Sequence, residues 1–392
     1  MTDKHLMNTY GRQAIALEKG DGVYVWDKDG KKYLDALGGI AVCSLGHAHP
    51  AITQAICEQA GTLIHTSNIY HIAEQEKLAD KLCELSGMDR VFFGNSGAEA
   101  NEAAIKIARL YGHKNNIQNP AIIVTENSFH GRTLATLTAT GNRKIQAGFE
   151  PLVHGFVRVP YNNLDAIRDV AKNAKNVVAV LVEPVQGEGG INIPDSDYLN
   201  GIREIADEND WLMMLDEIQT GMCRTGKWFA HQHNNIKPDV MTLAKALGNG
   251  MPIGACLAAG KAADVLQPGN HGSTYGGNPL ACHTASTVVD TMKQINATEQ
   301  ATDLGNYLVT AFTDNLKDCQ GVTEIRGLGL MIGIELEKDC TELVALAIEQ
   351  GLLINVTAGK VIRLLPAIIT TKEQADELVN KLTTLIKTFL AR

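Results

Sequence analysis

Long apolar runs alternate with segments of helical spacing through the middle of the chain. The runs are AIIVTEN at 121–127, NVVAVLVEPV at 176–185, WLMMLDEI at 211–218 and DVMTLAKAL at 239–247. Strands that are apolar along their whole length are typical of a parallel sheet covered by helices on both faces. The pattern therefore predicts an α/β fold with a large, mostly parallel sheet flanked by helices.

The pattern changes toward both ends of the chain. Residues 21–37 predict two short strands joined by a DKDG turn. Beyond about residue 280, helices near 300–317 and 372–390 are mixed with short strands, which predicts a smaller α+β domain. We expect three parts: an N-terminal segment at 1–45 that packs with the small domain, a large domain at 46–280 and the small domain at 281–392.

Charge and composition narrow the class of protein. The formal net charge of −9 argues against a protein that binds nucleic acid through the phosphate groups. No segment approaches the roughly 18 uncharged apolar residues of a membrane span, and the N-terminus lacks a signal-peptide core. The eight cysteines never form a C-x-x-C pair, so neither a metal site nor a disulfide framework follows. We expect a cytoplasmic protein that binds neither nucleic acid nor membrane.

Three of the predicted strands end in a charged residue. Glu183, Asp216 and Lys245 each follow an apolar run directly. Any one of them could simply reach solvent at a strand terminus. Because ligands gather at the carboxyl ends of parallel strands, an acid and an amine at neighbouring strand ends favour a shared pocket.

The turn FFGNSGAEANEAA at 92–104 predicts a place for an anion. Ser96, Gly97 and Ala98 open a helix after a short strand, so backbone N–H groups and the helix dipole would face a phosphate. Ordinary helix capping by Ser96 explains the same residues. The chain has no G-x-x-x-x-G-K-[ST] loop, and GLGLMIG at 327–333 lacks the spacing of a dinucleotide fingerprint.

A phosphate site, a lysine and a strand-end aspartate together are the anchors of pyridoxal 5′-phosphate. The lysine forms a Schiff base with the cofactor, and the acid pairs with its pyridine nitrogen. Phe129, after the strand at 121–125, supplies an aromatic ring that could stack on the pyridine, although a core phenylalanine is the simpler interpretation of that residue alone.

Seven ordered motifs then carry a resemblance over essentially the whole chain. They are GNSGAEANEAAIKIAR, SFHGRTLATLTATG, VEPVQGEGG, LDEIQTGMCRTGKWFA, LAKALGNGMPIGA, HGSTYGGNPLA and IRLLPA. The sequence resembles the class III, fold-type I pyridoxal-phosphate aminotransferases, and most closely the acetylornithine aminotransferases among them. The resemblance implies transamination of N2-acetylornithine with 2-oxoglutarate by a ping-pong mechanism through pyridoxamine phosphate, a step of arginine biosynthesis.

The resemblance also implies how the cofactor is held. Lys245 would be the Schiff-base lysine and the base that moves the substrate proton, and Asp216 would bind the pyridine nitrogen. The remaining cofactor contacts would come from Ser96, Gly97, Ala98, Phe129 and Gln219, and from Thr274, which would reach the phosphate in a neighbouring subunit. The implied active unit is a homodimer with active sites at the subunit interface.

Substrate contacts follow from the same resemblance. Arg132 and Arg363 would bind substrate carboxylates, for which an arginine fork is suited. Ser273 would assist on the acylated ornithine. Glu188 resembles a gate that pairs with Arg363 while the amino donor is bound and releases it for 2-oxoglutarate. Without the family, Arg363 reads equally well as a surface arginine on a strand.

Three positions depart from the family's usual pattern or bear on the substrate. Asn249 and Cys223 stand where glycine is common, and asparagine tolerates a left-handed backbone better than most residues. By its offset from Gly46, Ile40 stands where ornithine aminotransferases carry a tyrosine. The loss of that phenol favours an N-acylated substrate over free ornithine.

The sequence leaves other functions open. Activity on ornithine, succinylornithine, N-succinyldiaminopimelate or 4-aminobutyrate would use the same cofactor anchors. A nicotinamide-dependent dehydrogenase is disfavoured by the missing dinucleotide fingerprint. A cofactor-binding protein without activity is a third possibility, since a fold can be retained after its catalytic activity is lost. A metal hydrolase built on the His-x-His pairs at 47–49 and 231–233 lacks a recognisable third ligand.

Overall fold

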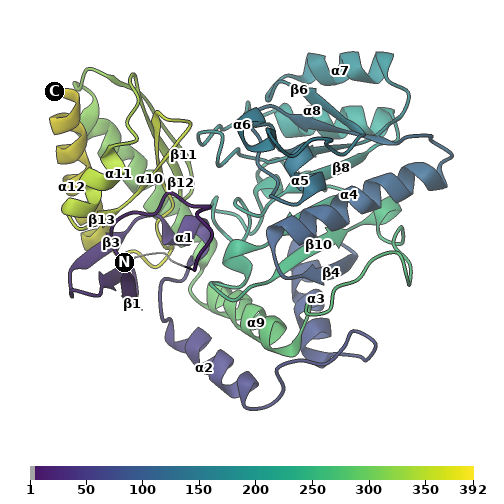
Figure 1. The fold of residues 1–392 in the computed structure, drawn as a ribbon, viewed down its shortest axis with the longest axis horizontal. Helices are drawn as coiled ribbons and strands as arrows, with labels where there is room; N and C mark the ends of the chain where they lie inside the picture. The colour runs from purple at the N-terminus through teal and green to yellow at the C-terminus, as the bar shows by residue number, and fades with distance from the viewer. Residues whose placement is uncertain (1–4) are drawn as a thin grey trace.

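The computed structural model describes residues 5–392, which form two lobes with a helical layer beneath them (Figure 1). The larger lobe is built on a seven-stranded sheet with the order β4-β10-β9-β8-β7-β5-β6. Its strands are β4 (Arg90–Gly94), β5 (Ala121–Thr125), β6 (Phe156–Val159), β7 (Val177–Val182), β8 (Leu212–Asp216), β9 (Val240–Leu243) and β10 (Gly254–Ala258). Among these seven, β10 alone runs in the direction opposite to the other six, so the predicted mostly parallel α/β sheet is confirmed.

Alternate residues of the sheet pack on opposite faces, as the period of a strand requires. Ile122 lies in the core on one side and Ile123 in the core on the other. The first side is covered by α4 (Gly97–Lys114), and the second by α7 (Leu164–Asn173) and α8 (Tyr198–Glu208). The short helices of this lobe are α5 (Leu134–Ala139), α6 (Arg143–Gln146) and the 3-10 turns η1 (Ala230–His233), η2 (Lys245–Leu247) and η3 (Gly260–Ala262).

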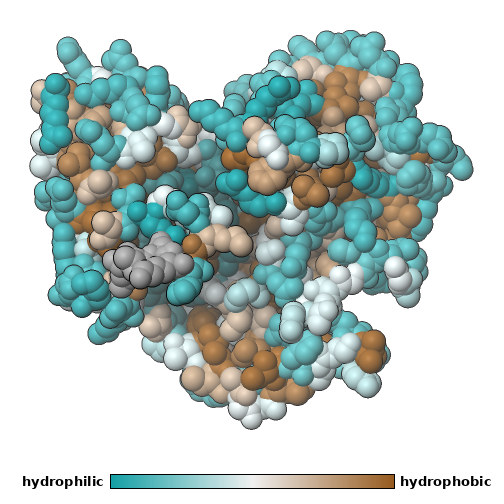
Figure 2. Space-filling model, viewed as in Figure 1, coloured by the Kyte–Doolittle hydropathy of each residue, from teal (hydrophilic) through white to brown (hydrophobic). Residues whose placement is uncertain are grey.

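The layer beneath the lobes consists of three helices. α9 (Pro279–Gln294) packs against α2 (Pro50–Ala60) and α3 (Ala73–Ser86). Figure 2 shows apolar side chains gathered low in the view, over the region of these helices. Within the described part of the chain, no helix combines the length and apolar character needed to cross a membrane.

The smaller lobe carries an antiparallel sheet with the order β11-β12-β15-β14. Its core is shared with the helical layer through a single apolar cluster that runs from α3 to α12. The strands are β11 (Val322–Leu328), β12 (Met331–Leu336), β14 (Asn355–Thr357) and β15 (Val361–Leu364), and the helices are α10 (Ala297–Leu316), α11 (Leu343–Glu349) and α12 (Lys372–Leu390).

The N-terminal strands join this smaller lobe. The expected hairpin is present as β2 (Tyr24–Asp27) and β3 (Lys32–Asp35), and β1 (Leu17–Asp21) adds a strand that the sequence pattern did not indicate. β13 (Leu352–Leu353) pairs in parallel with β3, which ties the two ends of the chain together. The boundaries of the three predicted parts remain a prediction.

The chain then crosses from the small lobe to the large one through residues 38–47, which we call the wall segment. It begins with α1 (Gly38–Ala41), a single turn in which all four residues have positive φ, between 56° and 66°. Ile40 has the least favourable backbone conformation of the four, because a β-branched side chain is strongly disfavoured at positive φ. Asp35 offsets part of this cost: its Oδ1 accepts hydrogen bonds from the N–H groups of Leu37 and Gly38.

The second oxygen of Asp35 fixes the far end of the wall segment. His47 Nε2 lies 2.8 Å from Asp35 Oδ2. This hydrogen bond, with another to Cys43, raises the pKa of His47 to about 10. A group with a raised folded-state pKa contributes its full stability below its unfolded pKa, near 6.5, and loses it as the pH rises toward 10.

We therefore expect His47→Gln to lower the free energy of unfolding by about 2 kcal/mol at pH 6.5, since a partly buried pair is broken. The difference between wild type and variant should shrink as the pH rises to 10. Urea unfolding at both pH values measures it. His71→Gln is the control, because the His71–Glu76 pair is exposed and should contribute little. An equal loss at both pH values would contradict the assignment of the charge to His47.

Candidate active site

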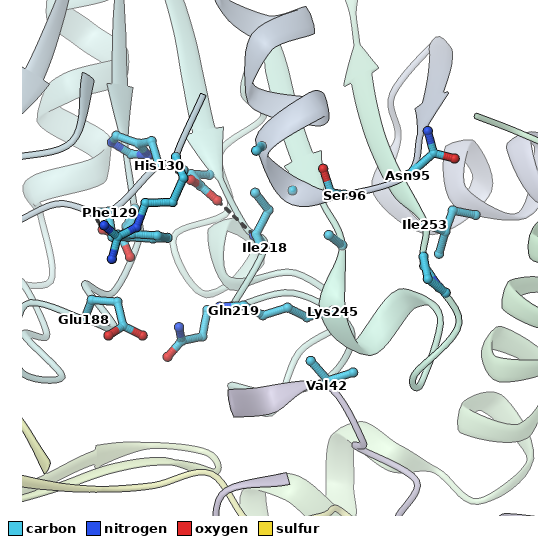
Figure 3. A pocket seen from close by; sticks show the side chains of 18 of the residues that line it. Val42, Asn95, Ser96, Phe129, His130, Glu188, Ile218, Gln219, Lys245 and Ile253 are labelled. Atoms are coloured by element: carbon cyan, nitrogen blue, oxygen red, sulfur yellow. Dashed lines mark hydrogen bonds and ion pairs between the residues drawn. The ribbon is translucent and has the colours of Figure 1, made fainter. Parts of the chain in front are cut away.

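A cavity of about 390 Å³ lies at the carboxyl ends of the parallel strands. Glu183, Asp216 and Lys245, which follow β7, β8 and β9, all line it. Figure 3 shows Lys245 extending across the centre of the cavity beside Gln219, with Phe129 and Glu188 on one side and Ser96 on the other. The strand ends thus meet at one edge of the sheet, where parallel sheets bind their ligands.

Lys245 occupies a strained position at the start of η2. Its φ is 45°, a left-handed value that is uncommon for a lysine. The side chain is enclosed, and burial lowers the pKa of the amine, with Glu188 opposing this shift and Arg363 adding to it. Within residues 5–392 no ion pair within 4 Å is formed by this amine. A lysine with a lowered pKa that faces a cavity has the properties of a nucleophile.

Asp216 is held by three donors. His130 Nδ1 and Asn101 Nδ2 each lie 2.8 Å from its Oδ2, and the N–H of Ile218 donates to Oδ1 at 3.1 Å. Since a carboxylate only accepts, His130 Nδ1 carries a hydrogen. Asp216 is 4% exposed and lines the cavity. Its Oδ1 accepts one hydrogen bond within the described structure, so this oxygen could accept a second one from a ligand.

His130 and Asn101 were not predicted from the sequence. His130 follows Phe129 in the SFHGRT motif and lines the cavity, and its Nε2 is buried without a partner in the described structure. Asn101 lies on the buried face of α4 and accepts a hydrogen bond from Thr242 of β9 through its Oδ1. A polar residue among the buried alanines of that helix was the available signal.

The N-terminus of α4 opens into the same cavity. Ser96 caps the helix, its hydroxyl oxygen accepting a hydrogen bond from the N–H of Glu99 at 3.2 Å. Gly97 and Ala98 line the cavity at the first positions of the helix, where N–H groups have no partner within the helix. A Cβ on Gly97 would lie 2.7 Å from Ile218 Cδ1, so glycine permits this approach. Capping and an anion site are thus compatible here.

Phe129 and Arg132 lie in the loop that follows β5, and both line the cavity. The guanidinium carbon of Arg132 lies 5.7 Å from the centre of the Phe129 ring, within the range of a cation–π contact. This contact places a cation beside an aromatic face at the cavity wall.

Arg363 lies behind the cavity, on β15 of the small lobe. It is fully buried, so a surface position is wrong for this residue. Its Nη1 donates to Glu188 Oε1 at 2.5 Å and to Gln219 Oε1 at 3.4 Å, and its Nη2 donates to Asn355 Oδ1 at 2.8 Å. Glu188 itself lines the cavity. The buried guanidinium is therefore covered by a carboxylate that faces the cavity.

Ser273 and Thr274 do not line the cavity of their own chain. Thr274 is exposed, and the Ser273 hydroxyl oxygen accepts hydrogen bonds from Asn95 Nδ2 at 3.2 Å and from the N–H of Gly276 at 2.9 Å. All the other predicted site residues either line the cavity or, like Arg363, contact a residue that does.

The wall segment closes the cavity through Val42. Ile40, the residue predicted to influence the substrate, packs instead against a small apolar cluster with Ala41, because the left-handed turn carries its side chain away from the cavity. Val42, which the sequence reasoning missed, is the side chain of this segment that borders the site.

Asn249 connects the wall segment to the loop that carries Lys245. Its φ is 45°, in agreement with the expected left-handed conformation, and Cys223 has a φ of 67°. Asn249 Oδ1 accepts a hydrogen bond from the N–H of Leu45 at 2.8 Å, and its Nδ2 donates to the carbonyl of Gly46 at 3.2 Å. Where glycine would supply only the conformation, asparagine also joins two walls of the cavity.

The family model described as "Aminotransferase class-III" matches residues 7–386. This chain belongs to the class-III aminotransferase family. The family predicted from the seven sequence motifs is thereby confirmed.

Curated relatives and solved structures that are named as aminotransferases are similar to this chain over nearly its full length. An acetylornithine aminotransferase from Nitrosomonas europaea is 58% identical and covers 98% of both chains. A crystal structure of the ornithine aminotransferase from Toxoplasma gondii matches with a TM-score of 0.95 at 33% identity, over 98% of this chain and 93% of that one. An acetylornithine aminotransferase from Elizabethkingia anophelis matches with a TM-score of 0.88 at 36% identity, over 98% and 97%.

Replacing Asn249 tests its bridging role. We expect Asn249→Ala to lower the free energy of unfolding by about 2–3 kcal/mol, because two hydrogen bonds are lost and alanine is strained at positive φ. Asn249→Gly should lose less, since glycine tolerates the conformation. Asn116→Ala is the control, because Asn116 has a φ of 59° but is exposed. Chemical denaturation measures all three, and an Asn249→Ala loss no larger than the control's would exclude the bridge.

Proposed function

We propose that this class-III aminotransferase transfers the δ-amine of N2-acetylornithine to 2-oxoglutarate, giving N-acetylglutamate 5-semialdehyde and glutamate. One observation carries the reaction type: an enclosed lysine, a buried aspartate and a helix N-terminus border the same cavity. The chemistry belongs to arginine biosynthesis in the cytoplasm, as the resemblance of the sequence implies.

The donor set of the cavity fits pyridoxal 5′-phosphate. Asp216 Oδ1 accepts a single hydrogen bond and could accept another from the protonated pyridine nitrogen, and the first turn of α4 suits a phosphate. Lys245 would bind the aldehyde carbon covalently, Phe129 would cover the ring and Gln219 would approach its phenolic oxygen. The bound cofactor supplies an electron sink that makes the carbon bearing the substrate amine acidic.

Lys245 and Asp216 would divide the acid–base work between them. The lowered pKa of Lys245 favours the neutral form of its amine, and in that form Nζ could take a proton from the δ-carbon of the substrate. Asp216, fixed by His130 and Asn101, would keep the proton on the ring nitrogen. Their separate environments, one enclosed amine and one hydrogen-bonded carboxylate, support these opposite roles.

Two arginines would select substrates that carry carboxylates. Arg132 borders the cavity directly, whereas Arg363 is covered by Glu188. With the Glu188–Arg363 pair closed, the site presents one free arginine, which suits an acylated amino acid with a distal amine. When Glu188 turns away, a second carboxylate can bind, as 2-oxoglutarate requires.

The choice of an N-acylated amine rests on two observations. The curated relatives at 46–58% identity over nearly the full chain are named acetylornithine aminotransferases. The cavity is bordered at the wall segment by the apolar side chain of Val42. An apolar wall favours an acetyl group over a free ammonium.

A homodimer would complete the site. An exposed apolar patch lies between α2 and α3 and includes Leu63, Ile64, Ile69 and Tyr70. The same segment contacts the loop of Thr274, since the rings of His65 and Tyr275 lie 5.3 Å apart. Covering this patch with a second copy would bury apolar surface and bring Thr274 and Ser273 to the neighbouring cavity.

Removing the lysine tests the reaction type. We expect Lys245→Ala to lower the transamination rate by at least several hundred-fold, because proton transfer contributes about 10²–10⁴-fold. Lys227→Ala, which changes an exposed lysine, should retain the wild-type rate. Steady-state turnover of both variants gives the comparison. Near-normal turnover by Lys245→Ala would remove this assignment.

Single-turnover spectroscopy on the holoenzyme tests the substrate. Without any oxo acid, the absorbance of the bound cofactor is followed after adding N2-acetylornithine, ornithine, succinylornithine, N-succinyldiaminopimelate or 4-aminobutyrate. We expect N2-acetylornithine to react fastest. A clear preference for another amine would overturn the substrate but leave the reaction type, and the absence of any cofactor band after adding pyridoxal phosphate would overturn both.

A further inference from the structure

Glu183 is a charged residue of the cavity without a role so far. It follows β7 directly, lines the cavity and is only 4% exposed. The sequence marks it as one of three charged strand ends, yet neither the cofactor nor the substrate contacts proposed above use it.

The carboxylate of Glu183 binds the backbone of two different loops. Its Oε1 accepts a hydrogen bond from the N–H of Phe129 at 2.9 Å, and its Oε2 accepts one from the N–H of Gly187 at 3.1 Å. The first loop carries the ring proposed to cover the cofactor. The second carries Glu188, which covers Arg363. One side chain therefore links the ring-covering loop to the gate loop.

Gly187 permits the hydrogen bond to Glu183 because it has no side chain. A Cβ at position 187 would collide with the side-chain amide of Gln219, which borders the cavity beside Lys245. Glycine lets the gate loop lie close enough to Gln219 for its N–H to reach Glu183. The carboxylate of Glu183 thus joins two walls of the site, and Gln219 packs against the second of them.

The ionised form of Glu183 is disfavoured at this position, because the side chain is buried. Within the described residues no ion pair within 4 Å reaches it. Burial raises its pKa to about 7; the charge of Asp216 adds to the shift, and His130 and the two backbone N–H groups oppose it. The other titratable groups that interact with it are Lys245 and Tyr161, whose hydroxyl donates to the Glu183 carbonyl at 3.1 Å.

A glutamine would fill the same space without a buried charge, but it could not accept both hydrogen bonds. Its amide has one acceptor oxygen, so it can satisfy only one of the two N–H groups, while its own NH₂ would face the other. The ionised carboxylate is the form that accepts both.

We propose that Glu183 is a positioning residue whose ionised carboxylate holds the ring-covering loop and the gate loop in fixed register. The roles of the two loops rest on the proposed function, whereas the link itself rests on the contacts of Glu183. Ionisation of Glu183 therefore fixes the two loops and at the same time lowers the free energy of unfolding.

The test compares Glu183→Gln with wild-type holoenzyme between pH 5 and pH 8. The glutamine resembles the protonated acid. We expect kcat/KM of the variant to be about tenfold to a hundredfold below wild type at pH 8, since one buried donor loses its acceptor. The ratio should approach one as the pH falls below 7, where wild type is protonated as well.

Stability should change in the opposite direction. The folded-state pKa of Glu183 lies above its unfolded value, so its contribution to stability is lost as the pH rises from 4.5 to 7. We expect the Tm difference to shift by a few degrees in favour of Glu183→Gln from pH 5 to pH 8. A residue with a purely structural role would make activity and stability fall together.

Hydrogen exchange reports the link without any activity. In Glu183→Gln, peptides that contain residues 126–133 and 184–190 should both exchange faster than in wild type. Glu126→Gln is the matched control, because Glu126 is an exposed glutamate at the end of the neighbouring strand β5. It should leave exchange in both peptides and the pH profile unchanged.

Each outcome decides the proposal. Kinetic constants of Glu183→Gln within twofold of wild type at pH 8, or faster exchange in only one of the two peptides, would overturn it. If the variant does not fold, corrected exchange of both peptides in wild type must change together near pH 7, and the absence of that step would overturn it. Faster exchange in both peptides in a protein that transfers no amine would support the link and refute the proposed function alone.

Discussion

The hydrogen bonds around Asp216 connect α4, the sheet and the loop after β5 to the cavity. Their donors come from α4, from the loop after β5 and from the turn after β8, and Asn101 is in turn fixed by Thr242 of β9. A buried carboxylate needs such partners, because an unsatisfied one would cost several kcal/mol. If β8 slipped by one residue, Asp216 would point to the other face of the sheet and lose the donors from Asn101 and His130.

What could be predicted from the sequence follows the strength of the apolar signal. β5, β7, β8 and β9 are buried along their whole length and appear as continuous apolar runs. β10 was missed because GACLA is built largely of small residues, and β6 because its burial is only partial. A strand of small residues takes its place from the pairing of its neighbours, which the local sequence does not record.

The same limit applies to the candidate site. Lys245, Asp216 and the start of α4 were found because polar or glycine residues interrupt an apolar pattern. Val42 and His130 could not be found in this way, since an apolar residue in a loop and a histidine beside a phenylalanine carry no local signal. The position of Val42 depends on a left-handed turn that Asp35 caps and that places Ile40 outside the cavity. Such backbone geometry becomes visible only in three dimensions.

Two buried arginines, Arg363 and Arg224, form hydrogen bonds between the two lobes. Arg363 of the small lobe reaches Glu188 and Gln219 of the large one. Arg224 is also fully buried, and burial lowers its pKa to about 10; it donates to the Ser44 hydroxyl at 2.7 Å and to the Pro366 carbonyl at 2.5 Å. Apolar residues in these places would pack at lower cost, since desolvating a guanidinium is unfavourable.

The arginines nevertheless differ in what their partners allow. Arg224 donates to a carbonyl and a hydroxyl that are fixed in the wall segment and after β15, so its contacts hold the lobes in one arrangement. Arg363 donates to a carboxylate whose side chain is 38% exposed and borders the cavity, so under the proposed function a substrate carboxylate would compete for the same guanidinium. The fixed contacts of Arg224 would keep the lobes together during that exchange, and the energy of the new ion pair would then be available for choosing the substrate.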